Sequence, residues 1–262
     1  MNSNWLAEWG PIKFLIDNMM NPILSMFHAV GGNWGLAIVL LTISVKLILH
    51  PLTAKAIRSS LTMQKLAPQL KEIQEKYKNN PDRLKDEMMD FYKKYQFNPL
   101  AGCFPILLQL PFFIALYSML LSTKFAQEVA GTTFLGITSL THMGIVDSVT
   151  KQTNLDIIVM ILLFGITTFL SQRIITKLDD PMQKQMLYMM PFIITIMFAI
   201  FPIMAGALLY MVVSNIVTIF QYIYLKKTFP AYEAAQEKRR ERMATVMQAY
   251  EDKKKNSQDS KK

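Results

Sequence analysis

The sequence has few charged residues and a single cysteine. Of 262 residues, 18% are charged and 52% are hydrophobic. The lone Cys103 excludes an internal disulfide, and the three histidines show no metal-ligand spacing. A soluble chain of this length would form one or two domains. The apolar residues instead come in long blocks, which is typical of a chain that spans a bilayer.

Enzyme signatures are also missing from the sequence. There is no glycine-rich phosphate loop, no His-Glu-x-x-His sequence and no paired-cysteine motif. The predicted membrane segments contain no Asp or Glu that could act as a proton relay or an aspartyl nucleophile, and Cys103 is interpreted as a packing residue. We therefore expect a protein that is not an enzyme and that needs no cofactor or metal ion.

Five apolar blocks approach or exceed the ~20 residues that a transmembrane helix needs. They lie at about 34–55, 99–121, 155–173, 186–201 and 206–225. The predicted fold is an all-α polytopic membrane protein with a five-helix core over 34–225. Within the preceding segment 1–33, residues 11–30 have the spacing of an amphipathic helix, which either lies in the membrane interface or packs on the core.

The basic residues alternate along the connecting segments, and this predicts the orientation. Segments 57–98, 123–153, 173–185, 202–205 and 226–262 carry nine, two, three, zero and eleven Lys or Arg residues. Cytoplasmic loops of membrane proteins are the ones rich in Lys and Arg. We therefore expect an external N-terminus, with 57–98, 173–185 and the C-terminal tail in the cytoplasm.

Segment 57–98 has the pattern of two helices rather than of a simple loop. Apolar residues recur at helical steps on both sides of a break at Lys78–Pro81, where Asn80 is a candidate N-cap. We expect a cytoplasmic helical hairpin that receives substrates, although its apolar residues also suit packing between its own helices. The residues singled out are Met63, Leu70, Tyr77, Met88 and Tyr95.

Lys46 is the most informative polar residue, because it lies inside the first predicted span. A central lysine costs about 2.5–3.5 kcal/mol on insertion scales, so it usually faces a bundle interior or an aqueous cavity. The alternative is that its side chain extends to the nearby interface. Polar residues of other spans favour a shared cavity, although the threonines alone suit ordinary hydrogen bonding between helices. The candidate groove residues are Lys46, Thr42, Gln109, Thr167, Ser171, Asn215, Thr218 and Gln221.

The tail 226–262 carries 11 basic and 6 acidic residues. Basic tails bind anionic lipids or nucleic acid, and they also control orientation. The sequence leaves these three roles open.

One stretch of the second predicted span resembles a family signature. Asn98 to Pro111, NPLAGCFPILLQLP, is similar to the signature of the bacterial YidC family of membrane insertases, which has relatives in mitochondria and chloroplasts. Further matching stretches are Gly32–Gly35, Pro51–Thr53, Asp180–Gln183 and Ser214–Thr218. The resemblance covers about residues 20–226. It implies a five-helix core with a cytoplasmic hairpin, and a hydrophilic groove that is open to cytoplasm and lipid but closed outside.

The resemblance also implies an activity and partners. The expected function is that of an insertase and membrane chaperone in the bacterial cytoplasmic (inner) membrane. Expected partners are nascent membrane proteins, the ribosome, the Sec translocon and anionic lipids, and no DNA. The family usually has arginine where this chain has Lys46, which keeps the charge but loses the planar fork. The chain also lacks the extra N-terminal span and large extracytoplasmic domain of many Gram-negative members.

A different class of function is also compatible with an intramembrane lysine. A small-molecule transporter or channel could use Lys46 as a counter-ion. Transporters of this kind often consist of repeated halves with interrupted helices, and five spans do not divide in that way. The sequence therefore favours the insertase.

Overall fold

The computed structural model describes residues 8–95, 104–129, 131–146, 153–175 and 181–259. The chain divides into two units, Met1–Tyr222 and Ile223–Lys262. The regular elements in the described ranges are helices, and the other backbone pairing is limited to three isolated bridges. The expected all-α fold is therefore confirmed.

The N-terminal segment is helical, as its amphipathic pattern predicts. It consists of α2 (Gly10–Leu15), the π-helical turn η1 (Ile16–Met20) and α3 (Asn21–Gly31). Its buried side chains Ile12, Ile16, Met20 and Leu24 belong to the main core. The wide π turn directly precedes Pro22, which has no amide hydrogen to continue the α-helical ladder. The irregular turn of this segment therefore lies just before the proline.

Helix α4 (Trp34–Ile48) forms most of the first predicted span. Asn33 caps it, because its side-chain oxygen accepts hydrogen bonds from the amides of Gly35 (2.8 Å) and Leu36 (3.2 Å). At Leu49 the chain bends by 65° into α5 (His50–Lys76). Pro51 stands in the first turn of α5, where its fixed backbone angle and missing amide hydrogen favour a new helix start.

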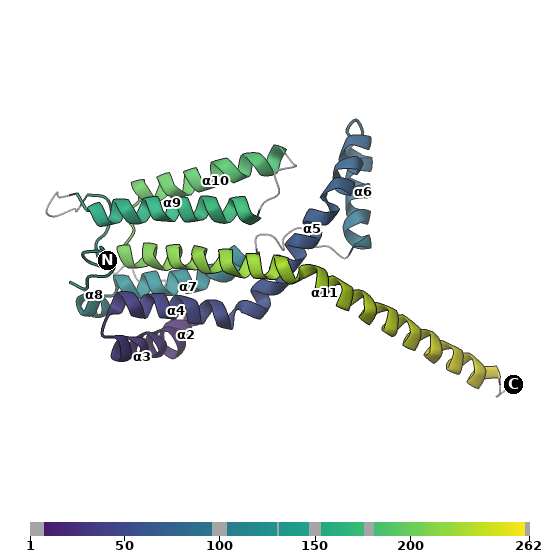
Figure 1. The fold of residues 1–262 in the computed structure, drawn as a ribbon, viewed down its shortest axis with the longest axis horizontal. Helices are drawn as coiled ribbons and strands as arrows, with labels where there is room; N and C mark the ends of the chain where they lie inside the picture. Colours follow the sequence, from purple (N-terminus) through teal and green to yellow (C-terminus); the bar gives the residue numbers. More distant parts are fainter. Residues whose placement is uncertain (1–7, 96–103, 130, 147–152, 176–180, 260–262) are drawn as a thin grey trace. The chain divides into compact units, whose positions relative to one another are not determined.

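Helices α5 and α6 (Pro81–Lys94) form an arm that projects at one end of the first unit (Figure 1). As expected, Asn80 caps α6 through a hydrogen bond from the amide of Arg83 (3.1 Å). The hydroxyl of Tyr77 donates to Glu87 (3.1 Å). The hydroxyl of Tyr95 donates to Gln69 on α5 (3.0 Å). We call these two helices the α5–α6 arm.

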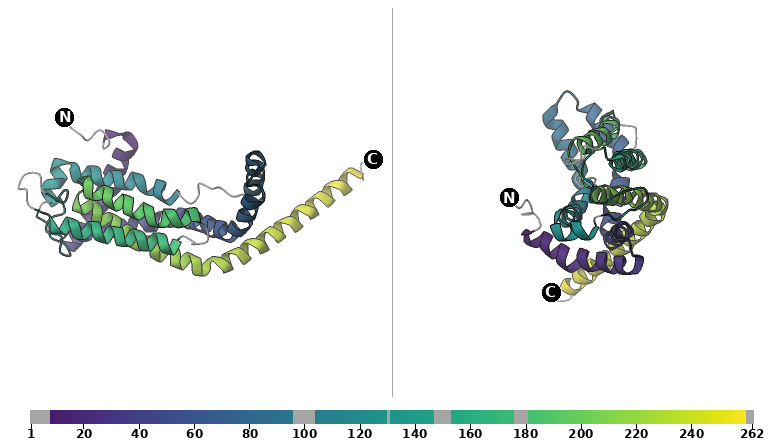
Figure 2. Two further views of the ribbon diagram at one scale, coloured as in Figure 1. Left: turned by 90° about the horizontal axis from the view of Figure 1, so that it is seen from above. Right: turned by 90° about the vertical axis from the view of Figure 1, so that its left-hand side faces the viewer.

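The remaining helices run alongside α4 in the first unit (Figures 1 and 2). They are α7 (Phe104–Leu121), α9 (Leu155–Ile175), α10 (Pro181–Ile200) and the first part of α11 (Ala205–Asp259). A short helix, α8 (Thr123–Val129), follows α7 after a bend of 81°. The core includes the fully buried side chains Ile38, Leu41, Leu116, Leu120, Leu208 and Tyr210.

Helices α9 and α10 pack closely on one another and expose apolar side chains elsewhere. A Cβ placed on Gly165 of α9 would lie 2.8 Å from Oγ1 of Thr195 on α10, so glycine allows this close approach. On one face of α9, Leu155, Leu162 and Ile166 are each more than half exposed. Soluble proteins rarely expose an apolar strip of this kind, whereas a helix in contact with lipid does.

Within the described residues, two helices, Leu155–Ile175 and Ala205–Lys238, are long and apolar enough to cross a membrane. The number rises to four if each bent pair is one span, and Tyr188–Ile200 is a shorter apolar helix. The five-span count therefore stays a prediction. Residues 98–103 of the family signature, with Cys103, lie outside the described residues, as does Asp180.

Candidate functional site

The polar side chains on α11 contact three different helices. Between residues 210 and 221, α11 bonds to Gln109 on α7, to two threonines on α9, and to Lys46 on α4. Six of the eight predicted groove residues therefore lie in three neighbouring contacts along α11 rather than in one constellation, and Thr42 and Ser171 lie outside these contacts. The residues of α11 that make these contacts are Tyr210, Asn215, Thr218 and Gln221.

Lys46 lies in the last turn of α4 and is partly buried. Its ammonium donates a hydrogen bond to Oγ1 of Thr218 (3.0 Å). The Thr218 hydroxyl donates its own hydrogen to the carbonyl of Ser214 (2.8 Å), which leaves its lone pairs for Lys46. Among the described residues, no carboxylate lies within ion-pair distance of Lys46. The side chain is thus held by a neutral hydroxyl.

Gln221 lies one turn after Thr218 and contacts the same part of the chain. Its Nε2 donates to the backbone carbonyl of Lys46 (3.2 Å) and lies 3.4 Å from Nδ1 of His50. Its Oε1 is buried and has no hydrogen-bond partner among the described residues. We call Lys46, His50, Thr218 and Gln221 the Lys46 cluster.

Asn215 joins α11 to α9. Its Nδ2 lies 2.9 Å from the hydroxyl of Thr168 and 3.3 Å from that of Thr167. A third contact joins α11 to α7, because the side-chain amide of Gln109 donates to the hydroxyl of the buried Tyr210. Both contacts satisfy polar groups between helices.

Thr42 and Ser171, like Gln221, are predicted groove residues that are buried in the bundle. Thr42 is completely buried, and its hydroxyl donates to the carbonyl of Ile38 in its own helix (2.7 Å). Ser171 is also buried. The hydroxyl of Thr167 likewise donates within its helix, to the carbonyl of Leu163 (2.8 Å). Thr42 and Thr167 thus donate within their own helices, whereas the simpler interpretation of the sequence was hydrogen bonding between helices, which is found where Thr167 lies 3.3 Å from the amide of Asn215.

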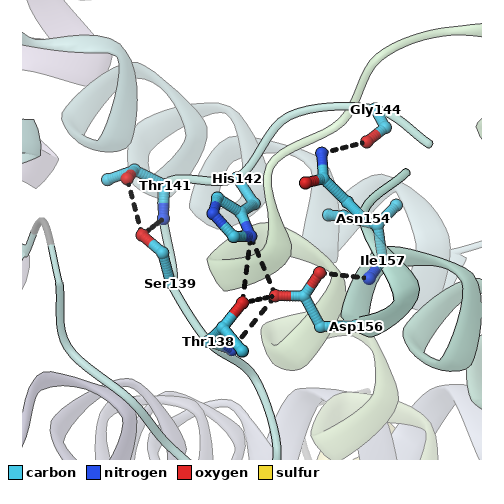
Figure 3. Close-up of polar contacts among 8 residues, drawn as sticks. All are labelled: Thr138, Ser139, Thr141, His142, Gly144, Asn154, Asp156 and Ile157. Atoms are coloured by element: carbon cyan, nitrogen blue, oxygen red, sulfur yellow. Dashed lines mark hydrogen bonds and ion pairs between the residues drawn. The ribbon is translucent and has the colours of Figure 1, made fainter. Parts of the chain in front are cut away.

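A second polar cluster lies at the start of α9 (Figure 3). One carboxylate oxygen of Asp156 accepts hydrogen bonds from the amide (3.0 Å) and hydroxyl (2.7 Å) of Thr138, and lies 2.9 Å from Nδ1 of His142. The other oxygen accepts from the amide of Ile157 (2.9 Å). The Asp156 side chain is 3% exposed. Every acceptor atom of this buried carboxylate therefore has a donor.

Residues 131–146 form the loop that carries these partners, and we call it the capping loop. Its carbonyls at Leu140 and His142 accept from the first amides of α11, those of Gly206 and Ala205, both at 2.9 Å. Its Thr133 carbonyl accepts from the side chain of Asn33 at the start of α4 (3.0 Å). One loop thus bonds to the N-terminal ends of α4, α9 and α11, and at α11 it satisfies two backbone amides that a helix start leaves unpaired.

The sequence analysis considered Asp and Glu in the membrane segments only as possible proton relays or nucleophiles, and it overlooked Asp156. This residue is in the predicted span 155–173, and the structure places it in the first turn of α9. Its partners come from residues 14 and 18 positions earlier, so helical periodicity could not reveal them. His50 and Tyr210 were also missed as partners of Gln221 and Gln109. The position of His50 next to Pro51, at a helix break, was the available signal.

The predicted arm residues have different surroundings. Leu70 is buried, whereas Tyr77 and Tyr95 make the hydrogen bonds between α5 and α6, and Met63 is half-buried. Met88 contributes to a shallow apolar hollow of about 330 Å³ on α6. The hollow is lined by Pro81, Leu84, Lys85, Met88, Met89 and Tyr92. Among the described residues, no group of three His, Cys, Asp or Glu could hold a metal ion.

Comparison with known proteins identifies relatives over most of the chain. Residues 26–237 match the family described as 60Kd inner membrane protein. A membrane protein insertase YidC from Wolinella succinogenes is 37% identical over 231 residues, which are 88% of this chain and 40% of that protein. One of the same name from Nitrosomonas eutropha is 40% identical over 208 residues, which are 79% of this chain and 31% of that protein.

A solved structure described as an active YidC insertase has the same fold. It matches with a TM-score of 0.61 at 23% sequence identity, and the match covers 78% of this chain and 45% of that one. The chain spans about 40% of the length of the first curated relatives that it matches. With the family model matched over residues 26–237 and the relatives about 37% identical, the chain belongs to the YidC family of inner membrane proteins, as its second-span signature predicts.

Proposed function

We propose that this chain inserts other proteins into the bacterial cytoplasmic membrane and assists their folding there. The observation that carries the proposal is Lys46, a charged group on an apolar helix with a neutral hydroxyl as its partner. A buried ammonium that lacks a carboxylate partner is costly. Such an ammonium is expected to persist where it attracts a negative charge, and an acidic segment of a substrate carries that charge.

The proposed topology has five spans, an external N-terminus, a cytoplasmic α5–α6 arm and a cytoplasmic tail. Support comes from the alternating Lys and Arg counts and from the exposed apolar strip on α9. In this arrangement the capping loop lies on the outside, and the Lys46 cluster lies near the cytoplasmic end of α4. The groove then runs along α11 and hydrates polar substrate segments part-way across the bilayer.

The driving force requires no cofactor in this proposal. The apolar part of the substrate moves into lipid, which is favourable by about 0.8 kcal/mol per buried methylene. The membrane potential acts on substrate charges, with about 2.3 kcal/mol per charge for each 100 mV. The proposed partners are nascent membrane proteins, the ribosome, the Sec translocon and anionic lipids. The arm would receive substrates, and the tail would bind the ribosome or lipid.

The test is reconstitution of the purified protein into liposomes with a single-span substrate, scored by protease protection. Two matched substrates differ only in whether the translocated segment is acidic or neutral. We expect Lys46→Arg to insert both substrates, because charge and reach are similar. We expect Lys46→Ala to lose insertion of the acidic substrate and to keep most insertion of the neutral one.

Two results would contradict the proposal. Absence of protection above that of empty liposomes, for both substrates, would exclude autonomous insertion. Equal insertion of the acidic substrate by wild type and Lys46→Ala would exclude a role for this charge with that substrate. Single cysteines at the exposed positions Thr133 and Asn79, in a Cys103→Ser background, should label from opposite sides of the membrane, and labelling from one side would exclude the five-span topology.

A further inference from the structure

The α4–α5 bend places the Lys46 carbonyl at a break in the hydrogen-bond ladder. In a continuous helix each carbonyl accepts from the amide four residues later. Here α4 ends at Ile48, so the amide four residues after Lys46 is that of His50, the first residue of α5 beyond the bend, and the missing amide hydrogen of Pro51 affects the carbonyl of Leu47 instead. At this break the Lys46 carbonyl accepts from Nε2 of Gln221, 3.2 Å away. A side chain of α11 therefore bonds to the backbone of the residue that carries the ammonium.

Lys46 is thus bound by α11 at both ends. Gln221 binds its backbone oxygen and Thr218 binds its ammonium at 3.0 Å. Thr218 and Gln221 are three residues apart, so they lie on the same face of α11. Two fixed points on one helix face restrict both the position of the Lys46 backbone and the direction of its side chain.

Gln221 itself is not available to a substrate. It is 8% exposed, and its Oε1 is enclosed without a partner among the described residues. A buried acceptor without a hydrogen-bond partner costs free energy. The contacts of Nε2 must offset this cost, and they hold the side chain in place. Those contacts are the Lys46 carbonyl and Nδ1 of His50. An effect of Gln221 on insertion must therefore pass through the residues at the bend.

We propose that Gln221 is a positioning residue that fixes Lys46 at the α4–α5 bend, so that its ammonium is directed toward acidic substrate segments. This inference rests on the insertase function proposed above. It changes the role of Gln221 from lining a groove to orienting the charge within it. Loss of one such hydrogen bond corresponds to roughly five-fold in an equilibrium, and we expect a loss of that size in insertion of the acidic substrate.

The test is a double-mutant cycle of wild type, Gln221→Met, Lys46→Ala and the double variant, each with the acidic and the neutral substrate. Methionine keeps the length of the side chain but cannot donate. Gln221→Met should reduce acidic-substrate insertion about five-fold when Lys46 is present and have no further effect in the Lys46→Ala background. Insertion of the neutral substrate should be unchanged. Gln127→Met, on the exposed surface of α8, is the matched control.

A second variant covers the case in which Gln221→Met does not fold. Gln221→Glu keeps the shape and places a carboxylate beside Lys46, so it should reduce acidic-substrate insertion more than methionine does and leave the neutral substrate unaffected. Equal losses with both substrates, or equal losses with and without Lys46, would show that Gln221 only supports the fold. An unchanged acidic yield in Gln221→Met would also overturn the inference. If Lys46→Ala alone has no effect, the charge-based function fails first.

Discussion

Asp156 and Lys46 are both charged residues on apolar helices, yet their surroundings differ. Asp156 has donors at both carboxylate oxygens, supplied by Thr138, His142 and Ile157. The Lys46 ammonium has three donor hydrogens, and Thr218 accepts one of them. A saturated buried charge stabilises the structure around it, whereas an incompletely satisfied one retains capacity to bind. This difference supports the proposal that the Asp156 cluster stabilises the fold and that the Lys46 cluster binds substrate.

The largest effect on stability is expected at Asp156. Asp156→Ala removes the acceptor of four hydrogen bonds and leaves the buried amide of Ile157 and the partly buried donors of Thr138 and His142 without it, so unfolding should become easier by on the order of 3 kcal/mol. Asp156→Asn keeps acceptor capacity and should lose less. Thermal unfolding in lipid nanodiscs measures both variants. An alanine variant as stable as wild type would mean that the capping loop does not depend on this carboxylate.

The next effect concerns the contact between the capping loop and α4. A Cβ on Gly35 would overlap the ring of Phe134, so Gly35→Ala should destabilise the fold by about 1–3 kcal/mol through overpacking. Phe134→Gly in the same chain removes the Cβ, which would lie 2.4 Å from the added Cβ, as well as the ring, so it should relieve the overlap and restore part of the loss. Gly10→Ala is the matched control, because nothing lies within 4 Å of its added Cβ. If the second substitution restored no stability, the loss in Gly35→Ala would not come from the contact with Phe134.

A smaller effect is expected between α9 and α11. Asn215→Ala removes the amide that bonds to Thr167 and Thr168, and hydrogen bonds between membrane helices contribute about 0.6 kcal/mol on average. Thr195→Val is the control, since the Thr195 hydroxyl bonds within its own helix to the carbonyl of Pro191. Unfolding in nanodiscs would distinguish the two variants. A loss above about 2 kcal/mol would show that Asn215 belongs with the architectural residues.

The smallest stability effect is expected at Lys46. Lys46→Ala loses one hydrogen bond but also removes a partly buried charge, so these terms oppose each other and the change should stay within about 0.5 kcal/mol. The variant should therefore unfold like wild type while losing acidic-substrate insertion. A stability loss as large as that of Asp156→Ala would remove the distinction between the two clusters.

More of the fold than of the site could be predicted from the sequence. Long apolar blocks and the cap at Asn80 predict helices directly, because periodicity and capping act over a few neighbouring residues. The contacts of Lys46 with Thr218 and Gln221 join residues 172 and 175 positions apart. The sequence could indicate that these polar residues need partners, but not which ones. Asp156 was missed for a related reason: a carboxylate at the edge of an apolar block resembles a simple boundary residue.

The bend at Leu49 also has an electrostatic consequence. The peptide dipoles of a helix sum to about half a negative charge at its C-terminal end, which favours a cation there. Because α4 ends at Ile48, Lys46 lies in the last turn of that helix. If α4 and α5 formed one straight helix, the same ammonium would lie far from either helix end. The break therefore supplies a partial negative charge from the backbone, which favours the ammonium at this position in an apolar bundle although no carboxylate among the described residues pairs with it.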